Sequence, residues 1–217
     1  MRVEALVFDA YGTLYDVHSV VQRCESCFPG KGTQLSQLWR AKQLEYTWQR
    51  SLMQRYAPFS QVTREALAYS CAALGLQLGE HEQALMEEYL RLAPFPEVRP
   101  ALARLAGKKA ILSNGSPDLL EPLVRNSRLH FDAVLSVDEL RIYKPAPQVY
   151  ELAVRRLGVP KERIAFVSSN CWDALGAKSY GFTVYWINRT GAPVDALGFA
   201  PDAQLESLSG LADEVLR

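Results

Sequence analysis

The segment VEALVFDAYGT, residues 3–13, sets the architecture that we expect for this chain. Its first six residues form a short apolar run that predicts a buried strand, and this strand ends at Asp9. An acid that closes a buried strand needs compensation for its lost hydration, so Asp9 is a candidate functional residue. The run contains a Glu and has no small-residue cleavage site after it, so we interpret it as a strand and not as a signal peptide.

Similar short runs recur along the chain and alternate with helical segments. The runs lie at 109–113, 133–136, 164–168 and 183–187. The helical patterns between them lie at 117–127, 146–157 and 171–180, and Leu205, Leu208, Leu211 and Val215 predict a last covering helix. Strand and helix in alternation predict an α/β fold with a parallel sheet and helices on both of its faces.

One long region, residues 17–95, departs from this alternation and contains only helical patterns. Amphipathic spacing is found at 35–46, 62–76 and 80–92. We therefore expect a helical cap domain, residues 16–96, inserted into a core domain formed by residues 1–15 and 97–217. Ligands of open α/β sheets bind beyond the carboxyl ends of the strands, so an insertion after the first strand lies where a lid belongs.

The composition argues against several classes of protein. The chain has 24 Lys and Arg residues against 24 Asp and Glu residues, so it lacks the basic excess of a nucleic-acid binder. Hydrophobic residues make up 48% and charged residues 22%, which is typical of a folded globular protein. No apolar run approaches the roughly 18 residues of a membrane span, so we expect neither a nucleic acid nor a membrane as partner.

With no signal peptide and no membrane span expected, a cytoplasmic protein is the default prediction, and cysteine usage agrees with it. Four cysteines in 217 residues do not form a disulfide framework. Cys24 and Cys27 form a C-x-x-C pair inside VVQRCESCF, which has a helical pattern, and no second ligand pair for zinc is found elsewhere. We interpret the pair as partly buried thiols on a helix.

Polar side chains gather after four of the predicted strands. They are Asp9 after the first, Ser113 and Asn114 after the second, Lys144 after the third, and Ser168, Asn170 and Asp173 after the fourth. Each also has a structural alternative: residues 113–116 can cap a helix, and Lys144 can simply be solvated. Asn170 with Asp173 resembles a capping box. Because parallel strands end at one edge of the sheet, the four groups together favour a functional site.

The chain resembles the L-2-haloacid dehalogenases of the haloacid dehalogenase superfamily in motifs spread over essentially its whole length. These motifs are FDAYGTLYDVHSV, LWRAKQLEYTW, ILSNGSP, SVDELRIYKP and FVSSNCWDA. The resemblance implies a Rossmann-like core, a helical cap, a homodimer, and no metal or other cofactor. It also implies hydrolysis of (S)-2-haloalkanoic acids to (R)-2-hydroxyalkanoic acids and halide, through an ester on an aspartate nucleophile.

Two positions differ from the metal-dependent phosphatases of the same superfamily, which are the main alternative. Tyr11 stands where those enzymes carry a second Asp as general acid, and expelling halide needs no proton. Ser169 stands where they typically carry an Asp that binds Mg²⁺, which a phosphoryl group needs and a carbon–halogen bond does not. Both differences favour substitution at carbon.

The resemblance also implies roles for individual residues. Asp9 attacks the α-carbon, and water then attacks the ester carbonyl of Asp9, so a single inversion is retained. The other catalytic residues are Thr13, Arg40, Ser113, Lys144, Tyr150, Ser168, Asn170 and Asp173. Thr13 and Lys144 hold the nucleophile, while Asp173 organises the second step, either as a base or as the partner of Lys144. Ser113 and nearby backbone N–H groups bind the substrate carboxylate.

The implied substrate-binding residues are Tyr11, Arg40, Leu44, Phe59, Ser113, Asn114 and Trp172. Arg40 and Asn114 match the halide cradle of the family, and the alternative for Arg40 is a surface ion pair with Glu45 or a neighbouring residue. For the aromatic residues and Leu44 the alternative is packing between cap and core. Trp48, Leu52 and Met53 favour a homodimer face, although they can instead pack inside the cap.

A second rival function is a catalytically silent protein that binds a partner in the cap groove. Binding alone needs no set such as Asp9, Arg40, Ser113 and Lys144, which argues against it. The chain-length preference and the ability to break a C–F bond do not follow from these motifs.

Overall fold

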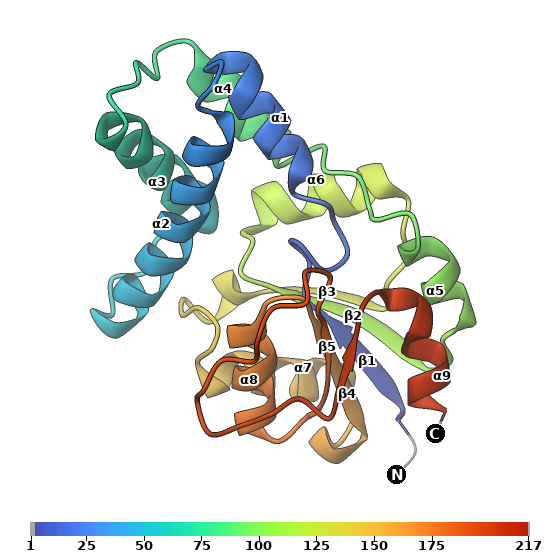
Figure 1. Cartoon of the computed structure of the whole chain (residues 1–217). Helices are drawn as coiled ribbons and strands as arrows, with labels where there is room; N and C mark the ends of the chain where they lie inside the picture. Colours follow the sequence, from blue (N-terminus) through green and yellow to red (C-terminus); the bar gives the residue numbers. More distant parts are fainter. Residues whose placement is uncertain (1–2, 217) are drawn as a thin grey trace.

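The computed structural model describes residues 3–216 and is built around a parallel sheet with the strand order β3-β2-β1-β4-β5-β6 (Figure 1). The strands are β1 (Ala5–Phe8), β2 (Lys108–Ser113), β3 (Ala133–Ser136), β4 (Ile164–Ser168), β5 (Thr183–Ile187) and β6 (Ala203–Leu205). This arrangement confirms the predicted α/β fold with a parallel sheet. Residues 1, 2 and 217, which belong to the predicted core domain, lie outside the described residues.

β1 occupies the middle of the sheet because all four of its residues are apolar and both of its faces are covered. Its side chains are buried, and it pairs with β2 through Ala5 and Lys108 and with β4 through Ala5 and Ile164. A parallel strand buried on both faces has a continuous apolar sequence, as VEALVF does. The carboxyl end of β1 therefore places Asp9 between the ends of two neighbouring strands.

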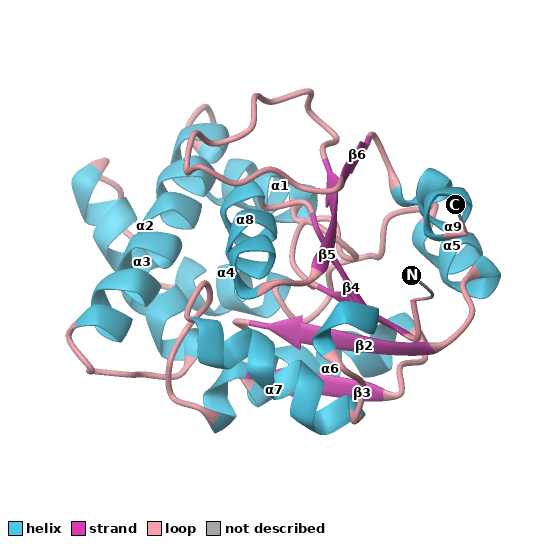
Figure 2. Ribbon diagram, turned by 90° about the horizontal axis from the view of Figure 1, so that it is seen from below, coloured by secondary structure: helices cyan, strands magenta, loops and turns pink. Residues whose placement is uncertain are grey.

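Helices cover both faces of this sheet. They are α5 (Val98–Arg104), α6 (Pro117–Ser127), α7 (Pro147–Leu157), α8 (Cys171–Tyr180) and α9 (Leu211–Val215), with short 3₁₀ turns η1 (Val137–Glu139), η2 (Lys161–Arg163) and η3 (Leu208–Gly210). α7 and α8 pack together on one face, and α5 and α9 lie on the other (Figure 2). Gly158 and Gly181 end α7 and α8 in the left-handed conformation that favours glycine.

The region between β1 and α5 forms helices that stand beside the sheet (Figure 1). They are α1 (His18–Cys27), α2 (Gly32–Leu52), α3 (Phe59–Ala73) and α4 (His81–Glu88). α3 starts earlier than predicted because the backbone N–H of Val62 bonds to the carbonyl of Pro58. α4 ends earlier than predicted because residues 89–91 continue in bonds of the tighter 3₁₀ type.

The two chain segments that join these helices to the core run side by side. The N–H of Asp16 donates to the carbonyl of Ala93 at 2.8 Å, and the N–H of Phe95 donates to the carbonyl of Leu14 at 3.0 Å. Helices α1 to α4 are thus attached to the rest of the chain by a pair of hydrogen-bonded linkers, the first of which begins within a few residues of Asp9.

The prediction of a covering helix from Leu205 was wrong in its first half. Leu205 ends β6, and helix α9 begins only at Leu211. Asp202 docks the segment beside β5, because its carboxylate accepts the N–H of Val184 at 2.8 Å and its own N–H donates to the carbonyl of Val184 at 2.9 Å. This pairing is long-range, so the local apolar spacing did not reveal it.

Cys24 and Cys27 lie on α1, as predicted, and both are free thiols. Cys24 is fully buried, and burial raises the pKa of its thiol to about 12, so it is a poor thiolate. Within residues 3–216 no helix is long and apolar enough to cross a membrane.

Candidate active site

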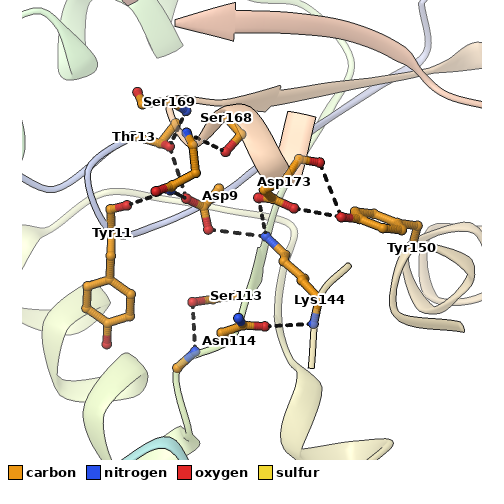
Figure 3. A network of polar contacts seen from close by, with 12 residues as sticks. Asp9, Tyr11, Thr13, Ser113, Asn114, Lys144, Tyr150, Ser168, Ser169 and Asp173 are labelled. Atoms are coloured by element: carbon orange, nitrogen blue, oxygen red, sulfur yellow. Dashed lines mark hydrogen bonds and ion pairs between the residues drawn. The ribbon is translucent and has the colours of Figure 1, made fainter. Parts of the chain in front are cut away.

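Asp9 lies just beyond β1, where its N–H still bonds to the carbonyl of Val167 in β4 at 2.9 Å. Its side chain is almost entirely buried, with three polar neighbours (Figure 3). Oδ2 accepts the hydroxyl of Thr13 at 3.1 Å and the side-chain amide of Asn170 at 2.8 Å. Oδ1 faces the ammonium of Lys144 at 3.2 Å. These contacts supply the compensation that a buried carboxylate requires.

The ammonium of Lys144 lies between two carboxylates, those of Asp9 and Asp173. The ammonium is fully buried, lies 2.9 Å from Oδ2 of Asp173, and sits over the ring of Phe166. Burial opposes the charged form, but the carboxylates of Asp173 and Asp9 outweigh it, so the pKa of Lys144 is raised above its ordinary value. The alternative that Lys144 is simply solvated was therefore wrong.

Asp173 occupies the first turn of α8 and is completely buried. Oδ1 accepts the hydroxyl of Tyr150 at 2.9 Å, while Oδ2 faces Lys144. Burial raises the pKa of Asp173 to about 6, against the opposing effect of Lys144. Tyr150 lies on the far side of Asp173 from Asp9 (Figure 3), and burial raises the pKa of its hydroxyl, so it acts as a neutral donor.

Asn170 and Ser168 are held by the turn between β4 and α8. The hydroxyl of Ser168 accepts the N–H of Asn170 at 3.1 Å, and the hydroxyl of Thr13 accepts the N–H of Ser169 at 2.8 Å. The side chain of Asn170 makes no capping bond to α8 and instead points to Asp9. The capping-box alternative for Asn170 was therefore wrong.

The turn after β2 presents a second group of polar atoms. The hydroxyl of Ser113 is buried and accepts the N–H of Gly115 at 3.0 Å, which leaves its own hydrogen available to another acceptor. The side-chain oxygen of Asn114 accepts the N–H of Lys144 at 3.0 Å. Ser116 makes no side-chain cap on α6; its hydroxyl accepts the N–H of Ser60 in α3. This bond joins α3 to the N-terminus of α6, so the helix-capping alternative was wrong for Ser116.

Aromatic side chains form an apolar wall above these polar groups. The ring of Tyr11 stacks on Phe59 of α3 with centroids 6.0 Å apart and meets the edge of Tyr89 at 5.9 Å. Trp172 contacts Trp48 of α2 edge to face at 5.6 Å. The hydroxyl of Tyr11 and the indole N–H of Trp172 are buried without a hydrogen-bond partner among the described residues.

Arg40 is half-buried on α2 and lines a groove of about 570 Å³ together with Leu44 and Tyr89. Within residues 3–216 its guanidinium forms no hydrogen bond or ion pair, and Glu45 pairs with Lys42 at 2.7 Å instead. The surface ion-pair alternative was therefore wrong. Burial raises the pKa of Tyr11 and Tyr89, and the positive charge of Arg40 acts in the opposite direction on both.

The structure thus brings the predicted residues of the four strand ends, except Ser113, into one network; the hydroxyl of Ser113 bonds only to the N–H of Gly115 among the described residues. Thr13, Lys144, Asn170, Asp173, Tyr150, Asn114 and Ser168 are connected to Asp9 by hydrogen bonds or ion pairs, directly or through one another. Arg40 and Leu44 are not joined to this network by a hydrogen bond. They lie on the cap side, in the groove between α1 and α2.

One buried polar residue near the site, Gln43, was missed. Gln43 on α2 donates to the hydroxyl of Thr63 at 3.0 Å and accepts the hydroxyl of Tyr89 at 3.2 Å. Gln43 follows Trp39 at helical spacing on the buried face of α2. A polar residue at a core-facing helical position was the available signal.

An ammonium occupies the position between the two buried carboxylates of this site. The two carboxylates that approach each other, Asp9 and Asp173, are bridged by an ammonium, so the position between them is filled by Lys144. Within the part of the chain that the structure describes, no group of three or more His, Cys, Asp or Glu side chains is arranged to hold a metal ion.

Comparisons with known proteins give a consistent result. A family model described as haloacid dehalogenase-like hydrolase matches residues 3–181. An (S)-2-haloacid dehalogenase from Pseudomonas sp. (strain YL) is 50% identical over 217 residues, which cover 97% of this chain and 94% of that protein. The crystal structure of an L-2-haloacid dehalogenase matches with a TM-score of 0.98 and 49% identity over 100% of both chains.

A further solved structure that matches this chain carries a covalently bound small molecule. It is an L-2-haloacid dehalogenase from Xanthobacter autotrophicus with chloropropionic acid covalently bound. Its TM-score is 0.92 with 44% identity, over 99% of this chain and 98% of that one.

Proposed function

The chain belongs to the haloacid dehalogenase-like hydrolases, and we propose that it hydrolyses (S)-2-haloalkanoic acids to (R)-2-hydroxyalkanoic acids and halide. One observation carries this proposal. A buried aspartate, held by Thr13, Asn170 and Lys144, lies beneath a cap whose arginine has no ionic partner among the described residues. A nucleophile below and an unpaired cation above suit a substrate from which an anion departs.

In the first step, an oxygen of Asp9 attacks carbon 2 of the substrate from the side opposite the halogen. The new C–O bond forms as the C–halogen bond breaks, and the halide leaves with the bonding electrons. Oδ2 already accepts two hydrogen bonds, whereas Oδ1 has only the ammonium of Lys144, so Oδ1 has the more available lone pair. We therefore assign the attack to Oδ1.

In the second step, water attacks the ester carbonyl carbon of Asp9, and the bond between that carbon and Oδ1 breaks. Oδ2 is then the carbonyl oxygen, on which negative charge develops. The hydroxyl of Thr13 and the amide of Asn170 already donate to Oδ2, so they form an oxyanion hole before the charge appears. Attack at this carbon leaves the inverted configuration at carbon 2 unchanged.

Asp173 is the group that we propose to accept the proton of the attacking water. It lies across the ammonium of Lys144 from Asp9, and its raised pKa of about 6 is close to the value at which a carboxylate works well as a base near neutrality. The proton then passes to the departing 2-hydroxy oxygen. Ser168 supports this turn by accepting the N–H of Asn170.

The substrate carboxylate and alkyl group have separate surroundings in the proposal. The carboxylate accepts the free hydrogen of the Ser113 hydroxyl and the N–H groups of the turn that begins at Asn114. The halide leaves toward Arg40 and the side-chain amide of Asn114. Tyr11, Leu44, Phe59 and Trp172 surround the alkyl group, and residues 16–96 act as the lid over a core of residues 1–15 and 97–217.

No metal enters this mechanism as we propose it. A phosphatase uses Mg²⁺ to let a carboxylate approach a phosphoryl dianion, whereas the α-carbon of a haloacid carries no such charge. Lys144 supplies the positive charge between the two carboxylates. The expected cytoplasmic location stays a prediction.

The function is tested by measuring halide release from (S)- and (R)-2-chloropropionate in the presence of EDTA. We expect release from the (S) form alone, with (R)-lactate as the product. Turnover of p-nitrophenyl phosphate with Mg²⁺ is measured in parallel. Phosphate release without halide release would overturn the proposal in favour of the phosphatase alternative, and release of neither would favour a binding protein.

The loss of rate at low pH should follow the protonation of the Asp173 carboxylate. A mechanism that needs the carboxylate is fully active above its pKa of about 6 and loses rate as the pH falls through that value. Tyr150→Phe removes a hydroxyl that stabilises the carboxylate, so the loss of rate should move to higher pH. The measurement is kcat between about pH 5 and 8. Tyr46→Phe, a tyrosine on α2, is the control, and an unshifted loss of rate in Tyr150→Phe contradicts the assignment.

We also propose that the protein is a homodimer in which α2 contributes to the interface. Leu52 is 85% exposed and Met53 is 60% exposed at the end of α2, so the alternative that they pack inside the cap was wrong. Leu52→Glu should convert a two-chain particle into a monomer in sedimentation at micromolar concentration, because it places charges in an apolar contact. Leu197→Glu, at a residue 62% exposed elsewhere, is the control. A monomeric wild-type chain contradicts the proposal.

A further inference from the structure

Arg189 lies two residues beyond β5, outside the motifs through which the chain resembles its family. Its guanidinium is largely buried and makes three contacts with different segments. Nη2 donates to the carbonyl of Thr13 at 2.9 Å, Nη1 pairs with Glu97 at 2.6 Å, and the group lies 3.8 Å from the centre of the Phe95 ring. One side chain just beyond β5 therefore holds two segments that are about eighty residues apart in the chain.

The first of these segments carries the nucleophile. Thr13 receives the N–H of Ser169 on its hydroxyl oxygen and passes its own hydrogen to Oδ2 of Asp9. No other donor among the described residues reaches the carbonyl of Thr13. The position of the Thr13 residue, and with it the direction of its hydroxyl, therefore depends on Arg189 on the backbone side.

The second segment is the linker by which the chain returns from the cap. The N–H of Phe95 bonds to the carbonyl of Leu14, the residue directly after Thr13. Glu97 and Phe95 present a carboxylate and a ring face to the same guanidinium, which matches the planar, multiply donating form of an arginine. The segment that contains Phe95 and Glu97 and the loop that contains Asp9 and Thr13 are thus both held by the guanidinium of Arg189.

We propose that Arg189 is a positioning residue for dehalogenation, which acts through Thr13. It holds the carbonyl of Thr13 so that the hydroxyl stays on Oδ2 of Asp9, and it fixes this loop to the linker at which the cap rejoins the core. The inference rests on the proposed function, in which Thr13 orients the nucleophile and later donates to the oxyanion. A lysine cannot bond to Thr13 and Glu97 in the same planar geometry.

The experiment measures halide release in a single turnover with excess enzyme, at a temperature well below the unfolding midpoint of every variant. Arg189→Met should lower this rate about ten- to a hundredfold, the scale of a small misplacement of a catalytic group, while KM changes by less than about threefold. Arg189→Lys should lose about threefold or more. Arg163→Met is the control, because Arg163 also pairs with a glutamate, Glu4 at 2.6 Å, within the proposed core domain. This variant should leave the rate unchanged.

A combined variant separates this role from a general loss of stability. Because Arg189 acts through Thr13, the double variant Thr13→Val with Arg189→Met should be as slow as Thr13→Val alone, within about twofold. Independent losses that multiply would overturn the proposal. So would a rate within twofold of wild type in Arg189→Met, or in Arg189→Lys if the Met variant does not fold.

The remaining outcomes distinguish an error in the role of Arg189 from an error in the role of Thr13 or in the proposed function. If Thr13→Val is slow but Arg189→Met is not, the inference about Arg189 is wrong and the proposed function stands. If Thr13→Val itself keeps the wild-type rate, the proposed use of Thr13 is wrong, and the role of Arg189 is wrong with it. If the wild-type protein releases no halide, the proposed function is wrong.

Discussion

Asp9→Asn is expected to abolish dehalogenation, with a loss of about 10⁴-fold or more, the scale seen when a catalytic nucleophile is removed. The amide is neutral and a poor nucleophile, so it cannot form the ester cleanly. Its NH₂ group would also take the place of a carboxylate oxygen that accepts hydrogen bonds. The neighbours of Asp9 are all donors: the hydroxyl of Thr13, the amide of Asn170 and the ammonium of Lys144. The variant therefore loses both the nucleophile and the hydrogen bonds that orient it.

The measurement is kcat for 2-chloropropionate, with folding of the variant checked by circular dichroism. Asp213→Asn is a control, because this exposed aspartate lies in α9 and should keep full activity. Activity of Asp9→Asn within tenfold of wild type would show that Asp9 is not the nucleophile.

Isotope labelling tests the same residue in the wild-type enzyme. In a single turnover in H₂¹⁸O, water attacks the ester carbonyl, so ¹⁸O should enter the carboxylate of Asp9 before it enters the product. Label found at once in the 2-hydroxy acid would mean that water attacks the substrate carbon directly, and the ester mechanism would then be wrong.

Arg40→Ala is expected to lower kcat about a hundredfold or more, the scale of losing one preorganised electrostatic donor. Within residues 3–216 the guanidinium has no ionic partner, so its charge is available to an incoming anion. Negative charge on the halogen grows as the C–halogen bond breaks, so the interaction strengthens in the transition state and mainly affects kcat. Arg40→Lys should restore only part of the rate, because the ammonium lacks the planar fork.

The choice of halogen makes this prediction specific. Chloride is a poorer leaving group than bromide and depends more on assistance, so Arg40→Ala should slow 2-chloropropionate more than 2-bromopropionate. Arg50→Ala is the control on the same helix, because Arg50 pairs with Glu65 and its loss should cost no more than about 1 kcal/mol of stability and no rate. Equal losses for both substrates, or no loss, would show that Arg40 is not the halide cradle.

Patterns within short stretches of sequence were enough to predict the fold. The apolar runs that became β1 to β5 are local features, because a strand buried on both faces must be apolar along its whole length. The parallel order then follows from the helices between the runs, and it places Asp9, Ser113, Lys144 and Ser168 near one edge. The sequence was therefore enough to predict that the candidate residues lie close together at this edge of the sheet.

The partners of each polar side chain depended on contacts between distant segments. Asn170 could cap α8 or bond to Asp9, and both are good hydrogen bonds; the position of Asp9 in space decides between them. Lys144 could be solvated, but the fold buries it between two carboxylates from β1 and α8. The choice is energetic and long-range, because a buried charge is stable only where opposite charges are already in place.

The same reason explains what was missed. β6 has only three residues and is held by Asp202 against Val184, a contact that no local spacing encodes. Gln43 and Arg189 are ordinary surface residue types. Only packing shows that Gln43 is buried and paired with Thr63 and Tyr89, and that Arg189 bonds to Thr13 and Glu97. The chain alone thus specified the first five strands of the sheet, the helices between β1 and α5 and the residue types at the strand ends. The tertiary structure decided which oxygen of Asp9 is held and by which donors, because hydrogen bonds join residues that are distant in the chain.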